Sequence, residues 1–243
     1  MIELKNISKK YSGAANYAVA PTDLIIKPGK IIGFIGHNGA GKSTTLKMMT
    51  GVLTPTTGDV EINGYSIINE DRKAKSDLGY VPDNPDVFLK LTGLEYLNFM
   101  GTAYGVEREV LNNRIDELAN KYLMSDKLND LIDSYSHGMR QKIVVMGALV
   151  HEPKILILDE PLTGLDPQAS RLLKDSMIDH VAKGHTVLFS THVLEVAEKL
   201  CDEILIINRG KIIYQGTLSD LKAQYQESES LEDIFFAITN END

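Results

Sequence analysis

The chain has 243 residues, 43% of them hydrophobic, and a formal net charge of −9 at pH 7. This length and composition suffice for one large domain, or for a core with a smaller subdomain, around a buried interior. The acidic balance argues against nucleic acid as a main partner, because a duplex-binding surface needs clustered Lys and Arg.

Membrane-spanning and secreted classes are also disfavoured. The longest apolar runs, Ile143–Val150 and Ile155–Leu158, are far shorter than the roughly 20 residues that a membrane-spanning helix requires. The N-terminus lacks the apolar core and cleavage site of a secretory signal, so we expect a soluble cytosolic protein. Cys201 is the single cysteine, and the six histidines show no metalloprotease spacing, so neither a disulfide nor a structural metal site is expected.

Short β-branched runs broken by turn residues fill the first part of the chain. They predict strands at Glu3–Ile7, Leu24–Ile26, Ile31–Ile35 and Val60–Ile62. Between the last two, Lys42–Thr50 has helical character and ends at Gly51.

A complete phosphate-binding loop lies between a predicted strand and this predicted helix. Its residues are Gly36, His37, Asn38, Gly39, Ala40, Gly41, Lys42 and Ser43. In G-x-x-x-x-G-K-[ST] the glycines let backbone N–H groups surround phosphate oxygens, at the positive end of the following helix. We expect Lys42 to reach the β- and γ-phosphates, Ser43 to ligate Mg²⁺, and Thr44 to be a further phosphate donor. The alternative, a chance glycine-rich turn, is disfavoured by the strand before it and the helix after it.

The middle of the chain, residues 84–150, changes to helical spacing. Apolar residues recur at intervals of three and four, with few strand-like runs. This pattern predicts an inserted helical subdomain.

Two acids follow the apolar run Ile155–Leu158. A magnesium-dependent NTPase needs a carboxylate at the end of a neighbouring strand, and Asp159 supplies one for the Mg²⁺ shell. Glu160 is placed to orient or deprotonate the attacking water. Either acid alone fits the plainer reading of a residue that ends a strand, but their combination with the loop favours an NTP site at the strand ends of an α/β sheet.

Strands and helices alternate in the remainder of the chain. Strands are predicted at Thr186–Phe189 and Ile204–Ile207, and helices at Pro167–Lys183 and His192–Leu200, which implies parallel pairing. A loose connection is expected over Gln224–Ser230, and a short docking helix over Leu231–Ile238.

From about Ile2 to Gly216, the sequence resembles the ATPase subunit of an ABC transporter, in its bacterial exporter-like branch. The segment Tyr135–Lys142 is similar to the family's signature L-S-G-G-Q, and departs from it at Tyr135, His137 and Met139. The resemblance implies an α/β P-loop NTPase core with a mainly parallel sheet, an N-terminal antiparallel β part and an inserted helical subdomain. We therefore expect an ATPase domain over residues 1–220 and a C-terminal tail over 221–243.

Several site residues follow from the resemblance alone. Ser136 and Gly138 would contact the γ-phosphate bound to the opposite subunit of a head-to-tail dimer, and Asp166 lies in a segment similar to the family's D-loop. His192 matches the switch histidine, and Tyr11 looks like the aromatic that stacks on adenine. Without the family, Ser136 and Asp166 are ordinary helix N-caps, His192 starts a helix, and Tyr11 is a core or edge residue.

The clearest departure is Asp83, where the family carries Gln. An ionised Asp ligates a metal but cannot donate a hydrogen bond. Two readings stay open: Asp83 is a Mg²⁺ ligand that relays nucleotide state to the helical subdomain, or it caps a turn beside Pro85.

By resemblance, two such subunits hydrolyse MgATP and drive separate transmembrane subunits, which we expect to export substrate. The ATPase partner is a second copy or a homologous subunit, at the cytoplasmic face of the membrane, and Val87–Leu97 is the expected surface for the permease. Two rivals remain: a soluble ABC ATPase acting on the ribosome or DNA, and a nucleotide switch that does not hydrolyse ATP.

Overall fold

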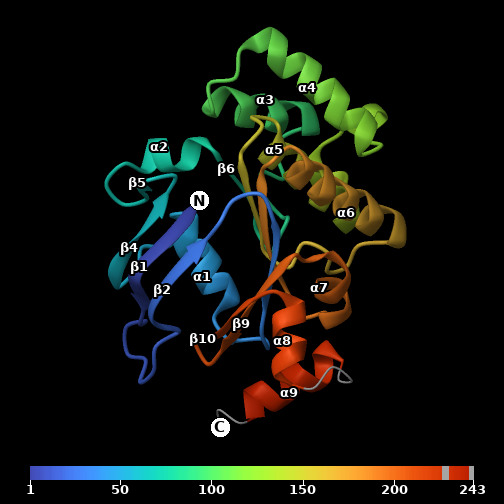
Figure 1. Cartoon of the computed structure of the whole chain (residues 1–243). Coiled ribbons are helices and arrows are strands. Elements are labelled where there is room, and N and C mark those ends of the chain that lie inside the picture. Colours follow the sequence, from blue (N-terminus) through green and yellow to red (C-terminus); the bar gives the residue numbers. More distant parts are fainter. Residues whose placement is uncertain (226–229, 241–243) are drawn as a thin grey trace.

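The computed structural model describes residues 1–225 and 230–240, which form two sheets and the helices packed on them (Figure 1). The larger sheet has the order β10-β9-β3-β8-β7-β6, and its strands pair in parallel apart from β10. Their bounds are β3 (Ile31–Ile35), β6 (Leu78–Val81), β7 (Ile155–Leu158), β8 (Thr186–Thr191), β9 (Glu203–Asn208) and β10 (Lys211–Gly216).

The central strands are apolar on both faces because both faces are covered. Every residue of β3, β7 and β8 is buried. Continuous apolar runs of this kind are typical of parallel strands between two layers of helices. Because these strands pair in parallel, their carboxyl ends meet at one edge of the sheet.

The smaller sheet is antiparallel, in the order β2-β1-β4-β5. Its strands are β1 (Ile2–Lys9), β2 (Val19–Ile26), β4 (Thr57–Ile62) and β5 (Tyr65–Ser66). Buried and exposed residues alternate along most of β2, as expected when one face of a sheet meets water. The buried face and the parallel sheet share one core cluster with α1 (Lys42–Met49), which lies between the two sheets (Figure 1).

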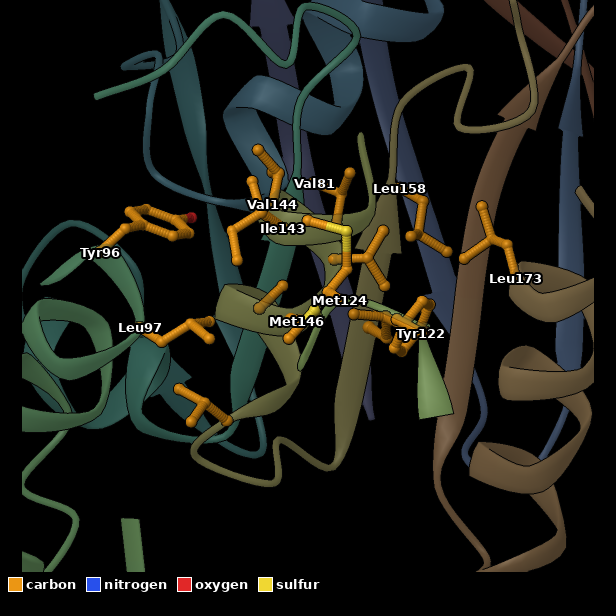
Figure 2. Close-up of a cluster of buried hydrophobic side chains, with 14 of the residues drawn as sticks. Val81, Tyr96, Leu97, Tyr122, Met124, Ile143, Val144, Met146, Leu158 and Leu173 are labelled. Carbon is orange, nitrogen blue, oxygen red and sulfur yellow. The ribbon is translucent and has the colours of Figure 1, made fainter. Parts of the chain in front are cut away.

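A helical part is inserted between β6 and β7. It contains α3 (Gly93–Ala103), α4 (Arg108–Lys121) and α5 (His137–Leu149), with two short 3-10 turns between α4 and α5. A capping box between Thr92 and Glu95 starts α3. Buried side chains from these helices and from β6 and β7 form one cluster (Figure 2). The helical part is thus packed on the edge of the parallel sheet and is not a free appendage.

The remaining helices complete the layers on the parallel sheet. They are α2 (Asp71–Ser76), α6 (Pro167–Ala182), α7 (Leu194–Leu200), α8 (Leu218–Gln224) and α9 (Leu231–Asn240). Figure 1 places α3 and α4 at one end of the molecule and α9 at the other. None of the helices in the described part of the chain has the length and apolar character of a bilayer-spanning segment.

The structure extends several predicted strands and adds elements that the sequence patterns do not reveal. The added elements are β5, β6, β10, α2 and α8. β6 has only four residues and contains Gly79, where a Cβ atom would lie 2.5 Å from the carbonyl oxygen of Ala148 on α5. A close helix contact, and not strand propensity, therefore selects the residue at this position. The connection expected over Gln224–Ser230 lies mostly outside the described residues.

Candidate functional site

The phosphate-binding loop occupies the turn from β3 into α1, as its motif requires. Gly39 and Gly41 have φ values of 81° and 111°, a region that L side chains rarely adopt. A Cβ atom on Gly36 would lie 2.6 Å from the carbonyl oxygen of Ile207. These glycines are therefore needed for the shape of the loop and for its close packing on β9.

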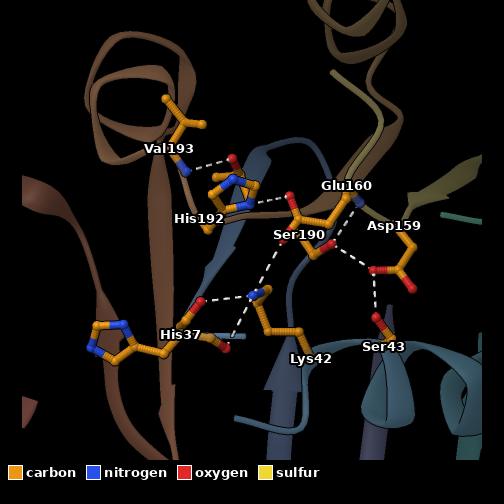
Figure 3. A network of polar contacts seen from close by, with 10 residues as sticks. His37, Lys42, Ser43, Asp159, Glu160, Ser190, His192 and Val193 are labelled. Atoms are coloured by element: carbon orange, nitrogen blue, oxygen red, sulfur yellow. Dashed lines mark hydrogen bonds and ion pairs between the residues drawn. The ribbon is translucent and has the colours of Figure 1, made fainter. Parts of the chain in front are cut away.

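Lys42 is folded back onto this loop (Figure 3). Its side chain is 5% exposed, and Nζ donates hydrogen bonds to the carbonyl oxygens of Gly36 at 2.7 Å and His37 at 3.3 Å. Nζ also lies 3.3 Å from Oε1 of Glu160. The buried ammonium group is thus held by the loop backbone and by the acid that follows β7.

Asp159 is fully buried at the end of β7. Its Oδ1 accepts hydrogen bonds from Oγ of Ser43 at 3.0 Å and from Oγ of Ser190 at 2.7 Å, whereas the buried Oδ2 has no hydrogen-bond partner. Burial raises the pKa of Asp159, and the bonds from Ser190 and Ser43 oppose that rise. A cation beside Oδ2 would satisfy this orphaned oxygen and favour the ionised acid.

Glu160 points away from Asp159 because its backbone is left-handed, with φ of 46°. Its Oε2 lies 2.9 Å from Nδ1 of His192, which follows β8 directly and precedes α7. The His192 ring is 46% exposed, so one face of the pair is open to solvent. The carboxylate of Glu160 therefore joins Lys42 and His192 in a single polar network.

Ser190 is a site residue that sequence reasoning did not identify. Its buried hydroxyl accepts from the backbone N–H of Glu160 at 2.7 Å and donates to Asp159. The signal was its position as a polar residue inside the apolar strand β8, which pairs in parallel with β7. Ser190 holds the two neighbouring acids in their separate directions.

The oxygen atoms that face the loop fit a hard divalent cation. Ser43 and Asp159 are bonded to each other, and Asp83, at the end of β6, lines the same hollow as Lys42, Thr44 and Glu160. Asp83 Oδ1 lies 4.0 Å from Nζ of Lys47, and the side chain is 48% exposed. Hydroxyl and carboxylate oxygens are the ligand types that Mg²⁺ accepts, and it commonly keeps several waters beside them. The turn that follows β6 is capped by Asn84, which accepts from the N–H of Asp86 at 2.9 Å.

The signature segment and the segment before α6 pack against each other. Ser136 is the N-cap of α5 and Asp166 the N-cap of α6. A Cβ on Gly138 would lie 3.6 Å from Oδ2 of Asp166, and His137 Nε2 lies 3.4 Å from the carbonyl oxygen of Thr163. Among the described residues that line the hollow beside Lys42, none comes from this signature segment. Within one chain, Ser136 and Gly138 therefore do not join the phosphate loop.

Tyr11 follows β1 and is 48% exposed, with Nζ of Lys9 lying 5.6 Å from the ring centroid. The same connection reaches the phosphate loop farther on, where a Cβ on Gly41 would lie 2.6 Å from the carbonyl oxygen of Ala18. The ring of Tyr11 is thus an open aromatic surface on a connection that touches the loop.

Comparisons with known proteins identify relatives of this chain. A sequence profile of the ABC transporter family matches residues 19–163. The ABC-type transporter ATP-binding protein EcsA of Bacillus subtilis is 33% identical over 100% of this chain and 98% of its own length. The Nod factor export ATP-binding protein I of Cupriavidus pinatubonensis is 34% identical over 91% of this chain and 67% of its own.

Two solved structures resemble the whole fold. The ATP-binding subunit of an ABC transporter superposes with a TM-score of 0.92 at 32% identity, covering 98% of this chain and 99% of that one. The dimeric structure of MJ0796, a bacterial ABC transporter cassette, superposes with a TM-score of 0.81 at 25% identity, covering 90% and 99%.

Ser190→Ala tests how the acid pair is held. The change removes a donor from buried Asp159 and leaves the N–H of Glu160 without its acceptor, so we expect the free energy of unfolding to fall by about 1–3 kcal/mol. The pKa of Asp159 is already raised in the folded chain, and losing the donor should raise it further. Urea unfolding and a carboxyl-carbon NMR titration measure the two effects.

Ser176→Ala is the matched control, because Ser176 is 3% exposed and bonded to the hydroxyl of Tyr122 at 2.8 Å, away from the acids. It should destabilise the chain without moving the pKa of Asp159. Equal Asp159 titrations in the two variants would contradict the role of Ser190.

Proposed function

The chain belongs to the ABC transporter family, and we propose that it is an ATP-hydrolysing subunit that works as a head-to-tail dimer on separate transmembrane subunits. The convergence of Lys42, the acids after β7, and His192 at one sheet edge is the observation that carries this function. These groups follow three different strands, β3, β7 and β8. A loop that only binds phosphate would need neither the acids nor His192. ATP is the substrate that the family binds.

The phosphate groups of ATP meet the loop backbone at the start of α1, with Lys42 and Thr44 as further donors. A γ-phosphate would replace the loop carbonyls and Glu160 as the partner of Nζ of Lys42. That exchange would free the Glu160 carboxylate from the ion pair. Tyr11 offers an exposed ring on which adenine can stack.

Ser43, Asp159 and Asp83 are the proposed ligands of Mg²⁺. The ion would neutralise charge on the phosphate oxygens as the γ-phosphoryl group is transferred. The unpartnered Oδ2 of Asp159 supports this placement, because a buried carboxylate oxygen without a donor is costly.

Glu160 is the proposed general base, and it orients the attacking water. Its Oε2 lies 2.9 Å from Nδ1 of His192, and the exposure of this ring supports a role for His192 in contacting the γ-phosphate. The left-handed turn at Glu160 directs this carboxylate away from the metal ligand Asp159, so that the two acids serve different roles.

Ser136 and Gly138 do not line the hollow beside Lys42 within one chain, and this supports a dimer in which they face the ATP site of the partner. The N-terminus of α5 carries a hydroxyl and backbone N–H groups, which suit a phosphate on the partner's ATP. Asp166 packs beside Gly138, so both segments would lie on the dimer interface. The dimeric MJ0796 cassette supports this assembly.

The transmembrane partner would dock on an exposed apolar patch near Asp83, formed by Phe88, Leu94, Phe99 and Leu131, each at least 36% exposed. The Phe88 ring lies 5.4 Å from that of Phe99 and 5.5 Å from that of Tyr96. Tyr96 is buried, but the neighbouring rings of Phe88 and Phe99 are exposed, and exposed aromatic side chains are a feature of interaction surfaces. The chain would then be held at the cytoplasmic face of the membrane by its partner.

Export is the proposed direction, and the name of the Nod factor export protein supports it. ATP-driven accumulation of substrate inside inside-out vesicles would be its signature, and accumulation in right-side-out vesicles would contradict it.

Glu160→Gln separates hydrolysis from binding. The amide keeps the shape of the side chain but cannot accept a proton, so we expect ATP binding to persist, turnover to fall by about 100-fold or more, and an ATP-bound dimer to accumulate. Steady-state kinetics and size-exclusion chromatography with ATP measure these outcomes. Glu195→Gln, an exposed acid on α7, should behave as wild type. Wild-type protein that shows no turnover even with its membrane partner would favour a nucleotide switch.

Asp83→Ala tests the metal role of this acid. If Asp83 ligates Mg²⁺, the concentration of Mg²⁺ that gives half-maximal hydrolysis should rise about tenfold while nucleotide binding is kept. Asp86→Ala is the control, because Asp86 pairs with Arg140 at 2.7 Å instead of facing the loop. An unchanged Mg²⁺ titration for Asp83→Ala argues against the ligand.

Phe99→Ser tests the docking patch. Phe99 is 50% exposed on α3, so its loss should leave the fold and the ATPase of the free chain intact but abolish binding to membranes that contain the transmembrane subunits. Sedimentation with inside-out membrane vesicles gives the measurement. Ile25→Ser, 48% exposed on β2, is the matched control, and equal binding by both variants would place the membrane contact elsewhere.

A further inference from the structure

Helix α9 lies against the phosphate loop, although nearly two hundred residues of sequence separate them. Ser230 and Asp233 bond reciprocally at its start, with the N–H of Asp233 donating to Oγ of Ser230 at 3.2 Å and the N–H of Ser230 donating to Oδ2 of Asp233 at 3.2 Å. This exchange is the pattern of a capping box. The first turn of α9 is therefore specified by its own sequence.

One face of α9 is buried. Its members recur at helical spacing and are Leu231, Ile234, Phe235 and Ile238. They share a cluster with Ile35, the last residue of β3 before the loop, and with Ala197 on α7, the helix that follows His192. The helix α9 thus shares a buried cluster with β3, which precedes the loop, and with α7, which follows His192.

Two aromatic rings of α9 lie near the His37 ring of the loop, and the ring of Phe236, at 6.2 Å between centroids, is the more distant of the two. The Phe235 ring lies 4.8 Å from the His37 ring at an interplanar angle of 60°, and Phe235 is 4% exposed. His37 is the second residue of the loop, and its carbonyl oxygen accepts from Nζ of Lys42. A shift of the His37 ring would therefore move the His37 carbonyl oxygen, which accepts the hydrogen bond from Lys42.

The helix α9 also contacts the turn between β9 and β10, and that turn contacts the loop. The backbone carbonyl oxygen of Thr239 on α9 accepts from Nδ2 of Asn208 at 3.2 Å, and the N–H of Gly210 donates to the carbonyl oxygen of Ala40 at 2.8 Å. A hollow lies between these contacts, lined by His37–Ala40, by Asn208 and Arg209, and by Thr239. The loop packs closely on β9 at Gly36, whereas its part from His37 to Gly39 lines this hollow, where the contacts at the rim help to hold it.

We infer that α9 is a brace for the phosphate loop and that Phe235 is a positioning residue for ATP binding, acting through His37. The alternative is that α9 only covers an apolar edge of the sheet. Covering that edge needs Leu231, Ile234 and Ile238, but it does not need an aromatic ring against the loop.

The test compares two variants of α9 in the full chain. Phe235→Leu keeps an apolar side chain on the buried face and removes the ring contact with His37. Ile234→Ala removes more of the buried apolar surface but leaves that ring contact in place. ATP affinity is measured by calorimetry with MgATP, and stability by urea unfolding.

If Phe235 positions the loop, Phe235→Leu should raise the Kd for MgATP about fivefold, the scale of one aromatic contact. Ile234→Ala should lower stability more but change Kd by less than about twofold. Equal effects on Kd, or an unchanged Kd for Phe235→Leu, would overturn the inference.

A double-mutant cycle with His37→Ala identifies the route. In that background Phe235→Leu should have no further effect on Kd, because its partner ring is gone, whereas a full fivefold effect would mean that Phe235 does not act through His37. The inference rests on the proposed ATP site at the loop. If wild-type protein does not bind MgATP, the proposed ATP site is wrong. If wild-type protein binds MgATP and Phe235→Leu and Ile234→Ala have the same Kd, only the bracing role of α9 is wrong.

Discussion

A buried ammonium group constrains the whole site. Lys42 is 5% exposed, and a charge so far from water must be compensated by hydrogen bonds or by an opposite charge. The carbonyl oxygens of Gly36 and His37 supply the first, and Glu160 supplies the second. The loop must therefore curl around its own lysine, and β7 must end where its second acid can reach that lysine. In the proposed function, a γ-phosphate would take the place of these oxygen atoms beside Nζ of Lys42.

The parallel pairing of the strands brings the partners of Lys42 close to its charged group. β6, β7, β8 and β3 are neighbours in the sheet, so the residues that follow them collect at one edge. The loop, the acid pair, His192 and Asp83 are far apart in the chain but belong to four adjacent strand ends. Ser190 refines the arrangement, because its hydroxyl bonds both the side chain of Asp159 and the backbone of Glu160.

The same edge connects the site to both ends of the molecule. β6 leads through Asp83 into the helical part, where aromatic residues lie exposed on α3 and before it. At the opposite end of the molecule from α3 and α4 (Figure 1), α9 contacts the loop through Phe235 and the turn at Asn208.

The sequence by itself determined the local parts of this site. The loop Gly36–Ser43, the apolar strand before Asp159 and the helical spacing of residues 84–150 are patterns within short stretches. In the structure, the loop and its flanking strand β3, and the strand β7 before Asp159, lie where they were expected. Tertiary structure alone decided which distant groups meet: the ion pair of Lys42 with Glu160, the two bonds of Ser190, the short strand β6, and the contact of Phe235 with His37. The physical reason is that backbone periodicity is read from neighbouring residues, whereas strand order, and the packing that selects Gly79 beside α5, depend on contacts between segments far apart in the chain.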